Sequence, residues 1–241
     1  MNNFIFDVDG TLTPSRQPID PIFKEWFTDF CINNDVYLVT GSDYAKTQEQ
    51  LGDYLLRWPV FVYNCSGSDV WAKGERVRTS DWTAPKELCD LMDGWLQSSK
   101  FSARTGRHIE ERPGMVNFSI VGRNATLAER EMYVTHDAAN RERETIALQI
   151  NSQFENITAT IGGETGIDIH PTGCDKSQIL ANFSKEDTLY FFGDRCEQGG
   201  NDYPLAHAIK TKGYRGASFN VKGWQDTWER LQALQEAKKA A

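Results

Sequence analysis

Short runs of apolar, strand-forming residues alternate with amphipathic stretches along the first third of the chain. Residues 4–8, 36–40 and 60–63 are short and apolar, which predicts three buried β-strands. Apolar residues recur at helical spacing over residues 20–33, and residues 43–56 also favour a helix. The order strand, helix, strand, helix, strand predicts a parallel, doubly wound sheet of the Rossmann-like α/β class.

The same alternation returns near the C-terminus. A strand is predicted at residues 188–192, a helix at about 202–210, a short strand at about 215–219 and a last helix at about 223–238. We therefore expect both ends of the chain to contribute to one α/β core.

The middle of the chain follows a different pattern. Residues 85–98 favour a helix, and residues 108–121 favour either a bent strand pair or one long strand. Residues 126–153 are charged with helical character, and residues 157–161 and 166–170 favour two more strands. This mixture indicates an α+β segment.

We therefore predict two domains. Residues 1–82 and 173–241 would form the α/β core, and residues 83–172 would form an inserted α+β domain. A chain of 241 residues is long enough to bury both cores.

Composition and charge narrow the classes of partner. Apolar residues make up 39% of the chain and charged residues 25%, as in ordinary globular proteins, and the formal net charge is −8. The sequence has no block rich in lysine and arginine, which argues against a nucleic acid or an anionic membrane as a partner. An anionic substrate would need a local basic pocket in this acidic protein.

The cysteines and the lack of targeting signals indicate a reducing compartment. No apolar run approaches the roughly 20 residues of a membrane span, and the first residues lack the basic flank of a signal peptide. The five cysteines are odd in number and widely spaced, without a CxxC pair. We expect free thiols, no zinc site and a cytoplasmic location.

Asp7 and Asp9 directly follow the first predicted strand. Ligands of open α/β sheets bind at this carboxyl end of the strands. One carboxylate can attack phosphorus as a nucleophile, and a second can carry the proton of the leaving or attacking hydroxyl. Two carboxylates repel each other, so a hard divalent cation is expected, and Gly10 permits the sharp turn. The alternative is a simple turn that ends a strand.

The full string DVDGTLT at residues 7–13 resembles the signature of the haloacid dehalogenase (HAD) superfamily. The resemblance implies that Asp7 is the nucleophile and Asp9 the general acid and base. It also implies that Mg²⁺ binds the Asp7 carboxylate and the main-chain carbonyl of Asp9.

Thr40-Gly41-Ser42-Asp43 ends the second predicted strand. A hydroxyl and backbone N–H groups at this place suit a phosphate, and the alternative is a helix cap formed by Ser42 or Asp43. The resemblance implies that a Ser or Thr here binds the transferring phosphoryl group. Thr40 fits best, with Ser42 as the alternative.

Lys176 follows the predicted insertion, and Asp194 and Asp202 follow the strand predicted near the C-terminus. Taken singly, a lysine is usually a surface charge, and Asp202 also suits a helix cap. The resemblance implies that Lys176 neutralises the phosphoryl group and the Asp7 carboxylate. It implies that Asp194 and Asp202 belong to an acidic cluster that supplies further oxygen ligands for Mg²⁺.

Five longer blocks are similar to the eukaryotic-type α-phosphomannomutases of the HAD superfamily. They are FDVDGTLTPSRQ (residues 6–17), GSDYAKTQEQLG (41–52), RPGMVNFSIVGR (112–123), GGETGIDIHPTGCDK (162–176) and FFGDRCEQGGND (191–202). The resemblance implies that the insertion is a cap domain, which closes over the core and carries sugar-phosphate ligands.

The same resemblance implies a Mg²⁺-dependent phosphohexose mutase. Such an enzyme interconverts mannose 1-phosphate and mannose 6-phosphate, or the glucose phosphates, with a hexose 1,6-bisphosphate as activator, and the likeness also suggests a homodimer through the cap. The positions that would bind substrate are Arg16, Ser42, Arg112, Asn117, Arg123, Arg130 and Asp168.

Arginine suits a clamp for the distal phosphate, since its guanidinium is planar, permanently charged and bidentate. Each arginine taken singly has the alternative of a solvated surface charge. This alternative applies most to Arg130, which lies between Glu129 and Glu131.

Some positions depart from the mutase pattern. Gly166 stands where the mutases have a Ser, so one phosphate ligand is missing, and Ser-Pro-Ile-Gly-Arg becomes SIVGR at residues 119–123. Asn64-Cys65-Ser66-Gly67 replaces Glu-Asn-Gly, and the segment after Asp202 lacks the acidic residues for a second structural ion, so we expect none.

Two other functions remain open. A HAD-type sugar-phosphate phosphatase would use the same phospho-Asp7 with water as the attacking group. The retained arginines favour the mutase, and Gly166 favours the phosphatase. A non-catalytic binding protein is disfavoured, because it would have no chemical need for the whole set of Asp7, Asp9, Lys176 and Asp194.

Overall fold

The computed structural model describes residues 2–240, and the chain divides into two compact units. The first unit contains the described chain up to Thr79, residues 176–198 and the chain from Asp202 onward. The second unit contains residues 80–175 with residues 199–201. Among the described residues, none of the helices combines the length and the apolar character needed to cross a lipid bilayer.

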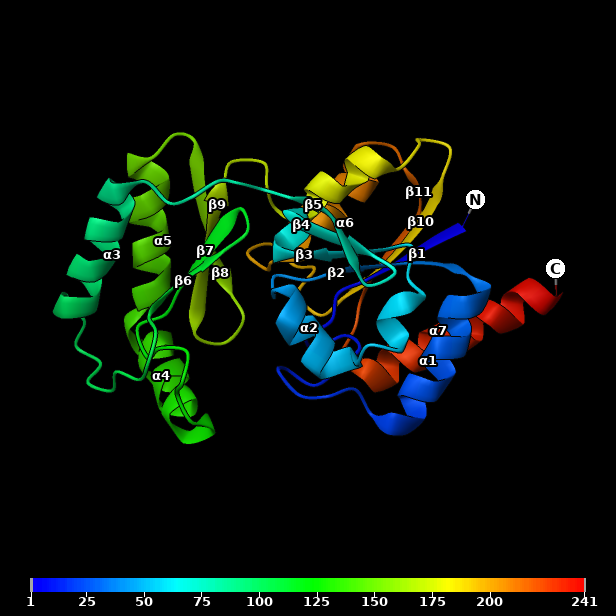
Figure 1. Ribbon diagram of the computed structural model, residues 1–241, viewed down its shortest axis with the longest axis horizontal. Helices are drawn as coiled ribbons and strands as arrows, with labels where there is room; N and C mark the ends of the chain where they lie inside the picture. Colours follow the sequence, from blue (N-terminus) through cyan, green and yellow to red (C-terminus); the bar gives the residue numbers. More distant parts are fainter. Residues whose placement is uncertain (1, 241) are drawn as a thin grey trace. The chain divides into compact units, whose positions relative to one another are not determined.

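Seven strands form the sheet of the first unit. They are β1 (Asn2–Phe6), β2 (Asp35–Val39), β3 (Phe61–Asn64), β4 (Asp69–Ala72), β5 (Glu75–Thr79), β10 (Thr188–Gly193) and β11 (Arg215–Asn220). Their order is β11-β10-β1-β2-β3-β4-β5, with β11 to β3 parallel and β4 and β5 antiparallel (Figure 1). This arrangement confirms the Rossmann-like, mostly parallel α/β fold predicted from the sequence.

Both faces are largely buried in the central strands β1, β2, β3 and β10, which explains why these strands are nearly continuous apolar runs. Side chains alternate between the faces with a period of two residues. In β1, Phe4 and Phe6 belong to one apolar cluster and Ile5 to another. In β10, Phe192 joins the first cluster and Leu189 the second.

Helices and short 3₁₀ turns cover the two faces. They are α1 (Pro21–Asn33), α2 (Tyr44–Leu51), η1 (Leu55–Arg57), η2 (Cys65–Gly67), η3 (Lys176–Asn182), α6 (Tyr203–Thr211) and α7 (Trp224–Ala240). Phe27 of α1 and Leu231 of α7 lie in the apolar cluster with Phe6, and Ile179 of η3 and Leu205 of α6 lie in the opposite one.

Two local predictions differ from the structure of this unit. The helix predicted at residues 43–56 ends at Leu51, because Gly52 adopts a left-handed φ of 79° and its N–H donates to the carbonyl of Gln48. The sequence pattern also misses the β4–β5 hairpin. Every residue of β5 is exposed, so this strand has no apolar alternation to detect.

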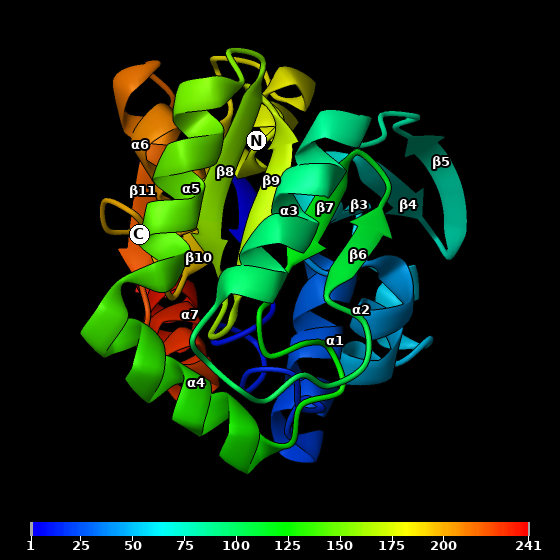
Figure 2. The same ribbon diagram turned by 90° about the vertical axis from the view of Figure 1, so that its left-hand side faces the viewer.

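The second unit has a four-stranded antiparallel sheet with the order β6-β7-β9-β8. Two helices lie over one face of this sheet, and a third lies beyond the ends of its strands (Figure 2). The elements are α3 (Lys86–Ser98), β6 (Ile109–Arg112), β7 (Met115–Phe118), α4 (Leu127–Asn140), α5 (Glu142–Gln153), β8 (Ile157–Gly162) and β9 (Gly166–Pro171). Residues 108–121 thus contain a strand pair, the first of the two predicted alternatives.

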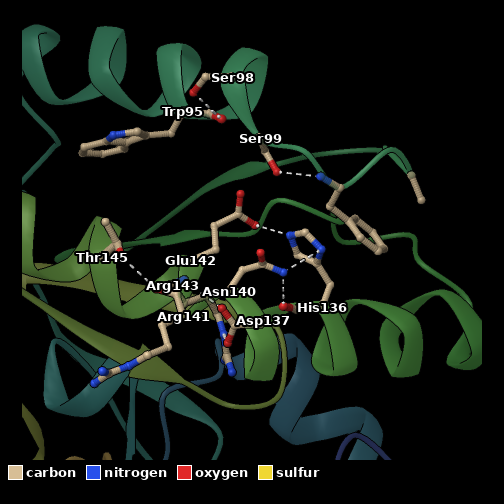
Figure 3. A network of polar contacts seen from close by, with 12 residues as sticks. Trp95, Ser98, Ser99, His136, Asp137, Asn140, Arg141, Glu142, Arg143 and Thr145 are labelled. Atoms are coloured by element: carbon tan, nitrogen blue, oxygen red, sulfur yellow. Dashed lines mark hydrogen bonds and ion pairs between the residues drawn. The ribbon is translucent and has the colours of Figure 1, made fainter.

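The charged stretch at residues 126–153 is two helices with a sharp corner between them. Arg141 has a left-handed φ of 52° and separates α4 from α5 (Figure 3). Asp137 accepts hydrogen bonds from the backbone N–H of Arg143 at 2.8 Å and from its guanidinium at 2.7 Å. The Arg143 guanidinium also donates to the carbonyl of Gly163 at 3.3 Å, which links the corner to the β8–β9 turn.

Candidate active site

The parallel pairing of β1 with β10 brings two aspartates to the same edge of the sheet. Phe6 pairs with Phe192, and the backbone N–H of Asp7 donates to the Phe192 carbonyl at 2.9 Å. Asp7 therefore follows β1 at the place where Asp194 follows β10. This edge is the carboxyl end of the parallel strands, where open α/β sheets bind ligands.

The loop after Asp7 turns tightly around one carbonyl. The backbone N–H groups of Thr11, Leu12 and Thr13 all approach the carbonyl of Val8, at 3.2, 2.9 and 3.1 Å. Gly10 permits this turn with a left-handed φ of 79°, and a Cβ atom at this position would lie 2.5 Å from the Asp194 carboxylate. Glycine is therefore required both for the backbone conformation and for the space beside that carboxylate.

Lys176 is a buried cation between two carboxylates. Its Nζ lies 2.6 Å from Oδ1 of Asp7 and 2.7 Å from Oδ1 of Asp202. The side chains of Lys176 and Asp202 are 1% and 0% exposed, so water does not screen these pairs. The structure therefore excludes the reading of Lys176 as a solvated surface charge.

The buried cluster carries more negative than positive charge. Burial raises the pKa of Asp7 well above its ordinary value, while Lys176 lowers it and Asp202 and Asp194 raise it. Burial and then Asp202 raise the pKa of Asp194 to about 6. Burial lowers the pKa of Lys176, but Asp202 and Asp7 outweigh this effect, so the pKa is raised and the ammonium persists. One cation thus faces three carboxylates, and the excess charge is unfavourable in a dry site.

This excess fits a hard divalent cation. Asp7, Asp194 and Asp202 each offer a carboxylate oxygen within 4.8 Å of the others, and carboxylate oxygens are the ligands that Mg²⁺ prefers. Asp202 has the least capacity left for an ion, because both of its carboxylate oxygens already accept hydrogen bonds. One accepts from Lys176 and the other from the backbone N–H of Arg195 at 3.1 Å. Asp7 and Asp194 therefore have the greater capacity to bind an ion.

The carboxylate of Asp9 is held by three donors. Its Oδ1 accepts from the backbone N–H of Arg16 at 2.6 Å and from the side-chain amide of Gln50 at 2.9 Å. Its Oδ2 accepts from the Ser42 hydroxyl at 3.4 Å. Since fixed hydrogen bonds orient a carboxylate, Asp9 suits a proton-transfer role better than that of a mobile surface acid.

Thr40 and Ser42 form the turn at the carboxyl end of β2. The Thr40 hydroxyl accepts from the backbone N–H of Ser42 at 3.1 Å, and Asp43 caps α2. Cys65 and Ser66 lie beside this turn with left-handed φ values of 49° and 57°. Backbone strain of this kind costs about 1–3 kcal/mol per residue and concentrates at functional sites.

Neighbouring contacts hold the strained segment in place, some of them from residues that the sequence analysis missed. The N–H groups of Cys65 and Ser66 donate to the carbonyls of Ser42 and Thr40 at 2.9 and 2.8 Å. The side-chain amide of Gln178 donates to the Ser66 carbonyl at 2.9 Å. A glutamine in an amphipathic segment gives no sequence signal for such a role, and the same is true of Gln50.

One face of the four-stranded sheet carries a row of polar side chains. Val116 and Ile169 point into the apolar core of the second unit, so their strand neighbours point to the opposite face. There Glu110 pairs with Asn117, and Asn117 pairs with Asp168, across β6, β7 and β9. The Asn117 amide donates to Oδ1 of Asp168 at 2.7 Å. Two of the predicted substrate-binding residues are therefore in direct contact.

Arg112 and Arg123 meet at a shared carboxylate of the same face. Both guanidinium groups contact Oε2 of Glu110, at 2.6 Å from Arg112 and 3.3 Å from Arg123. Arg130 lies apart from this contact, since it pairs with Glu164 at 2.8 Å and donates to the Thr165 hydroxyl at 3.2 Å. Arg130 is only 5% exposed, so it is not a solvated surface charge.

Two glycines make room for the Asn117–Asp168 pair. A Cβ atom at Gly162 would lie 2.3 Å from the Asp168 carboxylate, and one at Gly166 would lie 2.6 Å from the Asn117 amide. Gly166 therefore permits the observed position of Asn117. A serine here would force that amide to move.

Comparisons with known proteins identify the family of this chain. The sequence profile of the family "Eukaryotic phosphomannomutase" matches residues 23–237. The chain is 31% identical over 218 residues to a phosphomannomutase of Dendrobium officinale, covering 87% of this chain and 86% of the relative. It is 31% identical over 223 residues to a phosphomannomutase of Schizosaccharomyces pombe, covering 87% of each protein.

Solved structures support the fold. An IMP-nucleotidase of Plasmodium falciparum superimposes with a TM-score of 0.62 at 15% identity, covering 98% of this chain and 68% of that one. At this identity the likeness concerns the fold alone. Since the profile covers most of the residues and the relatives match along most of their length, this chain belongs to the eukaryotic phosphomannomutase family.

Proposed function

We propose that this protein is a phosphohexose mutase that interconverts mannose 1-phosphate and mannose 6-phosphate through a phosphorylated Asp7. The observation that carries the proposal is the buried contact of Asp7 with Lys176, beside the carboxylate of Asp194. A nucleophile, a cation and a metal-binding carboxylate at one sheet edge suit phosphoryl transfer. The relatives named phosphomannomutase support the choice of substrate.

In the proposed reaction a carboxylate oxygen of Asp7 attacks one phosphorus of a hexose 1,6-bisphosphate. The new O–P bond forms as the bond between phosphorus and the sugar oxygen breaks, and Asp9 gives that oxygen a proton. In the other step a free hydroxyl of the sugar monophosphate gives its proton to Asp9 and attacks phospho-Asp7, which forms the hexose bisphosphate and frees the carboxylate. The donors from Arg16, Gln50 and Ser42 orient Asp9 for both transfers.

Lys176 and the hydroxyls at the end of β2 would act on the phosphoryl oxygens. The Lys176 ammonium reduces the repulsion between the Asp7 carboxylate and an incoming phosphate dianion. Thr40 is proposed as the hydroxyl that binds the transferring group, with Ser42 as the alternative. Mg²⁺, bound by Asp7, Asp194 and the main-chain carbonyl of Asp9, would supply positive charge for the phosphoryl oxygens.

The polar face of the second unit would bind the rest of the substrate. Arg112 and Arg123 are proposed to take the distal phosphate, and Asn117 and Asp168 to bind sugar hydroxyls, because guanidinium groups match phosphate and the Asn–Asp pair matches hydroxyls. Arg130 and Arg16 are assigned to the same phosphate by resemblance to the family. A hexose 1,6-bisphosphate is proposed as the activator that first phosphorylates Asp7.

A sugar-phosphate phosphatase is the second candidate. The residue that favours it is Gly166, which offers no hydroxyl where the mutases have one, while Asn117 occupies the adjacent space. In this alternative, water in place of a sugar hydroxyl attacks phospho-Asp7.

Supplying mannose 1-phosphate with Mg²⁺ and a trace of hexose 1,6-bisphosphate is expected to give mannose 6-phosphate without an equal yield of free phosphate. Both products are followed in the same reaction. Free phosphate as the main product would contradict the mutase proposal and favour the phosphatase. Omission of the bisphosphate serves as the control for the activator.

Chelation of divalent cations by EDTA is expected to stop turnover, and added Mg²⁺ is expected to restore it. Asp194→Asn should raise the Mg²⁺ concentration for half-maximal activity by about 10–100-fold, because it removes a charged ligand. Asp35→Asn, at the opposite end of the strands, is the matched control and should leave that concentration unchanged. Full activity in EDTA would contradict the assignment of a metal.

A further inference from the structure

The two arginines proposed to bind the distal phosphate both contact the carboxylate of Glu110. Oε2 of Glu110 lies 2.6 Å from the Arg112 guanidinium and 3.3 Å from that of Arg123. The side chains are 6% exposed for Arg112, 13% for Glu110 and 29% for Arg123, so the contact is mostly shielded from solvent. A carboxylate and a phosphate use the same guanidinium donors.

Strand geometry fixes this arrangement. Glu110 and Arg112 are two residues apart on β6, so they point to the same face, and Glu111 points to the other. Arg123 arrives from a tight turn in which its N–H donates to the Arg107 carbonyl at 2.8 Å. The preceding Gly122 has a φ of 89°, and a Cβ atom there would lie 2.0 Å from the Thr105 carbonyl oxygen. The backbone therefore commits Arg123 to this position.

We propose that Glu110 is a resident counter-ion that competes with the substrate's distal phosphate for Arg112 and Arg123. This inference rests on the proposed function, and it adds a residue that sets how tightly the phosphate is held. A phosphate that enters must displace the carboxylate or lie beside it, and either event weakens binding.

Weak binding has a use in a mutase. The bisphosphorylated sugar must leave the arginine pair and present its other phosphate to Asp7 before the cycle is complete. An arginine pair without a competing anion would hold the intermediate more tightly, and binding that is equal in ground and transition states does not raise the rate. Glu110 therefore lowers the affinity for the distal phosphate and thereby speeds release of the intermediate.

Glu110→Gln tests the proposal and Glu111→Gln is its matched control. Both remove one negative charge from β6, but only the first removes it from the arginine pair. Calorimetric titration with mannose 6-phosphate is made in the full-length protein carrying Asp7→Asn, which prevents turnover. We expect Glu110→Gln to lower the Kd by about 10-fold and Glu111→Gln to change it by less than about 2-fold. Adding Arg123→Gln to Glu110→Gln should remove the gain.

The same variants in the active protein extend the test. Glu110→Gln should lower both KM and kcat for the sugar phosphate, because the intermediate is released more slowly. Gln keeps an amide oxygen as an acceptor for Arg112, and Glu110→Asp, which draws the carboxylate back from Arg123, serves if Glu110→Gln does not fold. Weaker phosphate binding in Glu110→Gln, or an equal gain in Glu111→Gln, would overturn the proposal.

Binding and turnover separate this inference from the proposed function. If Glu110→Gln lowers the Kd but the parent protein has no mutase activity, the counter-ion role of Glu110 is supported and the proposed mutase function is rejected. If the parent protein is a mutase but Glu110→Gln leaves the Kd unchanged, the mutase function is supported and the counter-ion role is rejected.

Discussion

Asp7→Asn is expected to lower turnover by about 10⁴-fold or more and to leave the folded protein at least as stable as the parent. An amide nitrogen or oxygen cannot replace the carboxylate as the group that forms an acyl phosphate. The loss should therefore appear in kcat for every sugar phosphate, whether the acceptor is a hydroxyl or water.

The expectation that Asp7→Asn does not destabilise the fold follows from the charge balance of the site. Burial raises the pKa of Asp7 well above its ordinary value, so the folded state binds its proton more tightly than the unfolded state does. The stabilisation linked to this proton is complete below the unfolded pKa and is lost as the pH rises through the folded pKa. At neutral pH the ionised carboxylate thus carries a cost that Asn does not. Lys176 keeps Asp202 at 2.7 Å as its partner.

Thermal unfolding in EDTA, with product assays at saturating substrate and Mg²⁺, measures both quantities. Asp35→Asn is the control for the loss of one carboxylate from the same sheet. Retention of turnover by Asp7→Asn would falsify the covalent mechanism. A fall in Tm of more than about 5 °C would contradict the charge argument, since 1 kcal/mol corresponds to about 2–4 °C for a chain of this size.

The central parallel strands could be predicted because they are buried on both faces. Phe4, Ile5 and Phe6 pack into two different apolar clusters, and that burial produces the apolar run that the sequence displays. β5 could not be predicted in this way, since it is exposed along its whole length. The break at Arg141 was also hidden, because the left-handed residue there is an arginine where a glycine would have marked it.

Some residues of the candidate site could also be predicted from the sequence, and others could not. Asp7 and Asp194 could be placed together because the ends of parallel strands share an edge, and this needs only the order of the strands. The contact of Glu110 with two arginines depends on the register of β6 and on a turn that brings Arg123 alongside, and a single sequence contains neither. Gln50 was missed for a similar reason, since its partner Asp9 is 41 residues away.

Lys176→Met is expected to weaken both the fold and the reaction. Methionine fills a similar volume but leaves Asp7, Asp194 and Asp202 without the ammonium that balances them. Removing one partner of a buried ion pair typically costs about 3–5 kcal/mol, which corresponds to a fall in Tm of roughly 6–20 °C here. Loss of the charge that faces the phosphoryl group should lower kcat by about 10²–10³-fold. Lys210→Met, an exposed position of α6, is the control.

The pH dependence of the Lys176→Met protein distinguishes lost charge from lost packing. Burial and then Asp202 already raise the pKa of Asp194 to about 6, and Lys176 is one of the groups that hold it down. Without that ammonium Asp7 and Asp194 retain their protons to higher pH, so the free energy of unfolding should fall more steeply between about pH 5 and 8 than in the parent. Adding Asp7→Asn should restore part of the stability, because it removes one of the unbalanced charges. An equal loss of unfolding free energy at about pH 5 and at about pH 8, with no recovery in the Lys176→Met/Asp7→Asn double variant, would contradict this. It would mean that Lys176 acts through its volume and that the site does not depend on its charge.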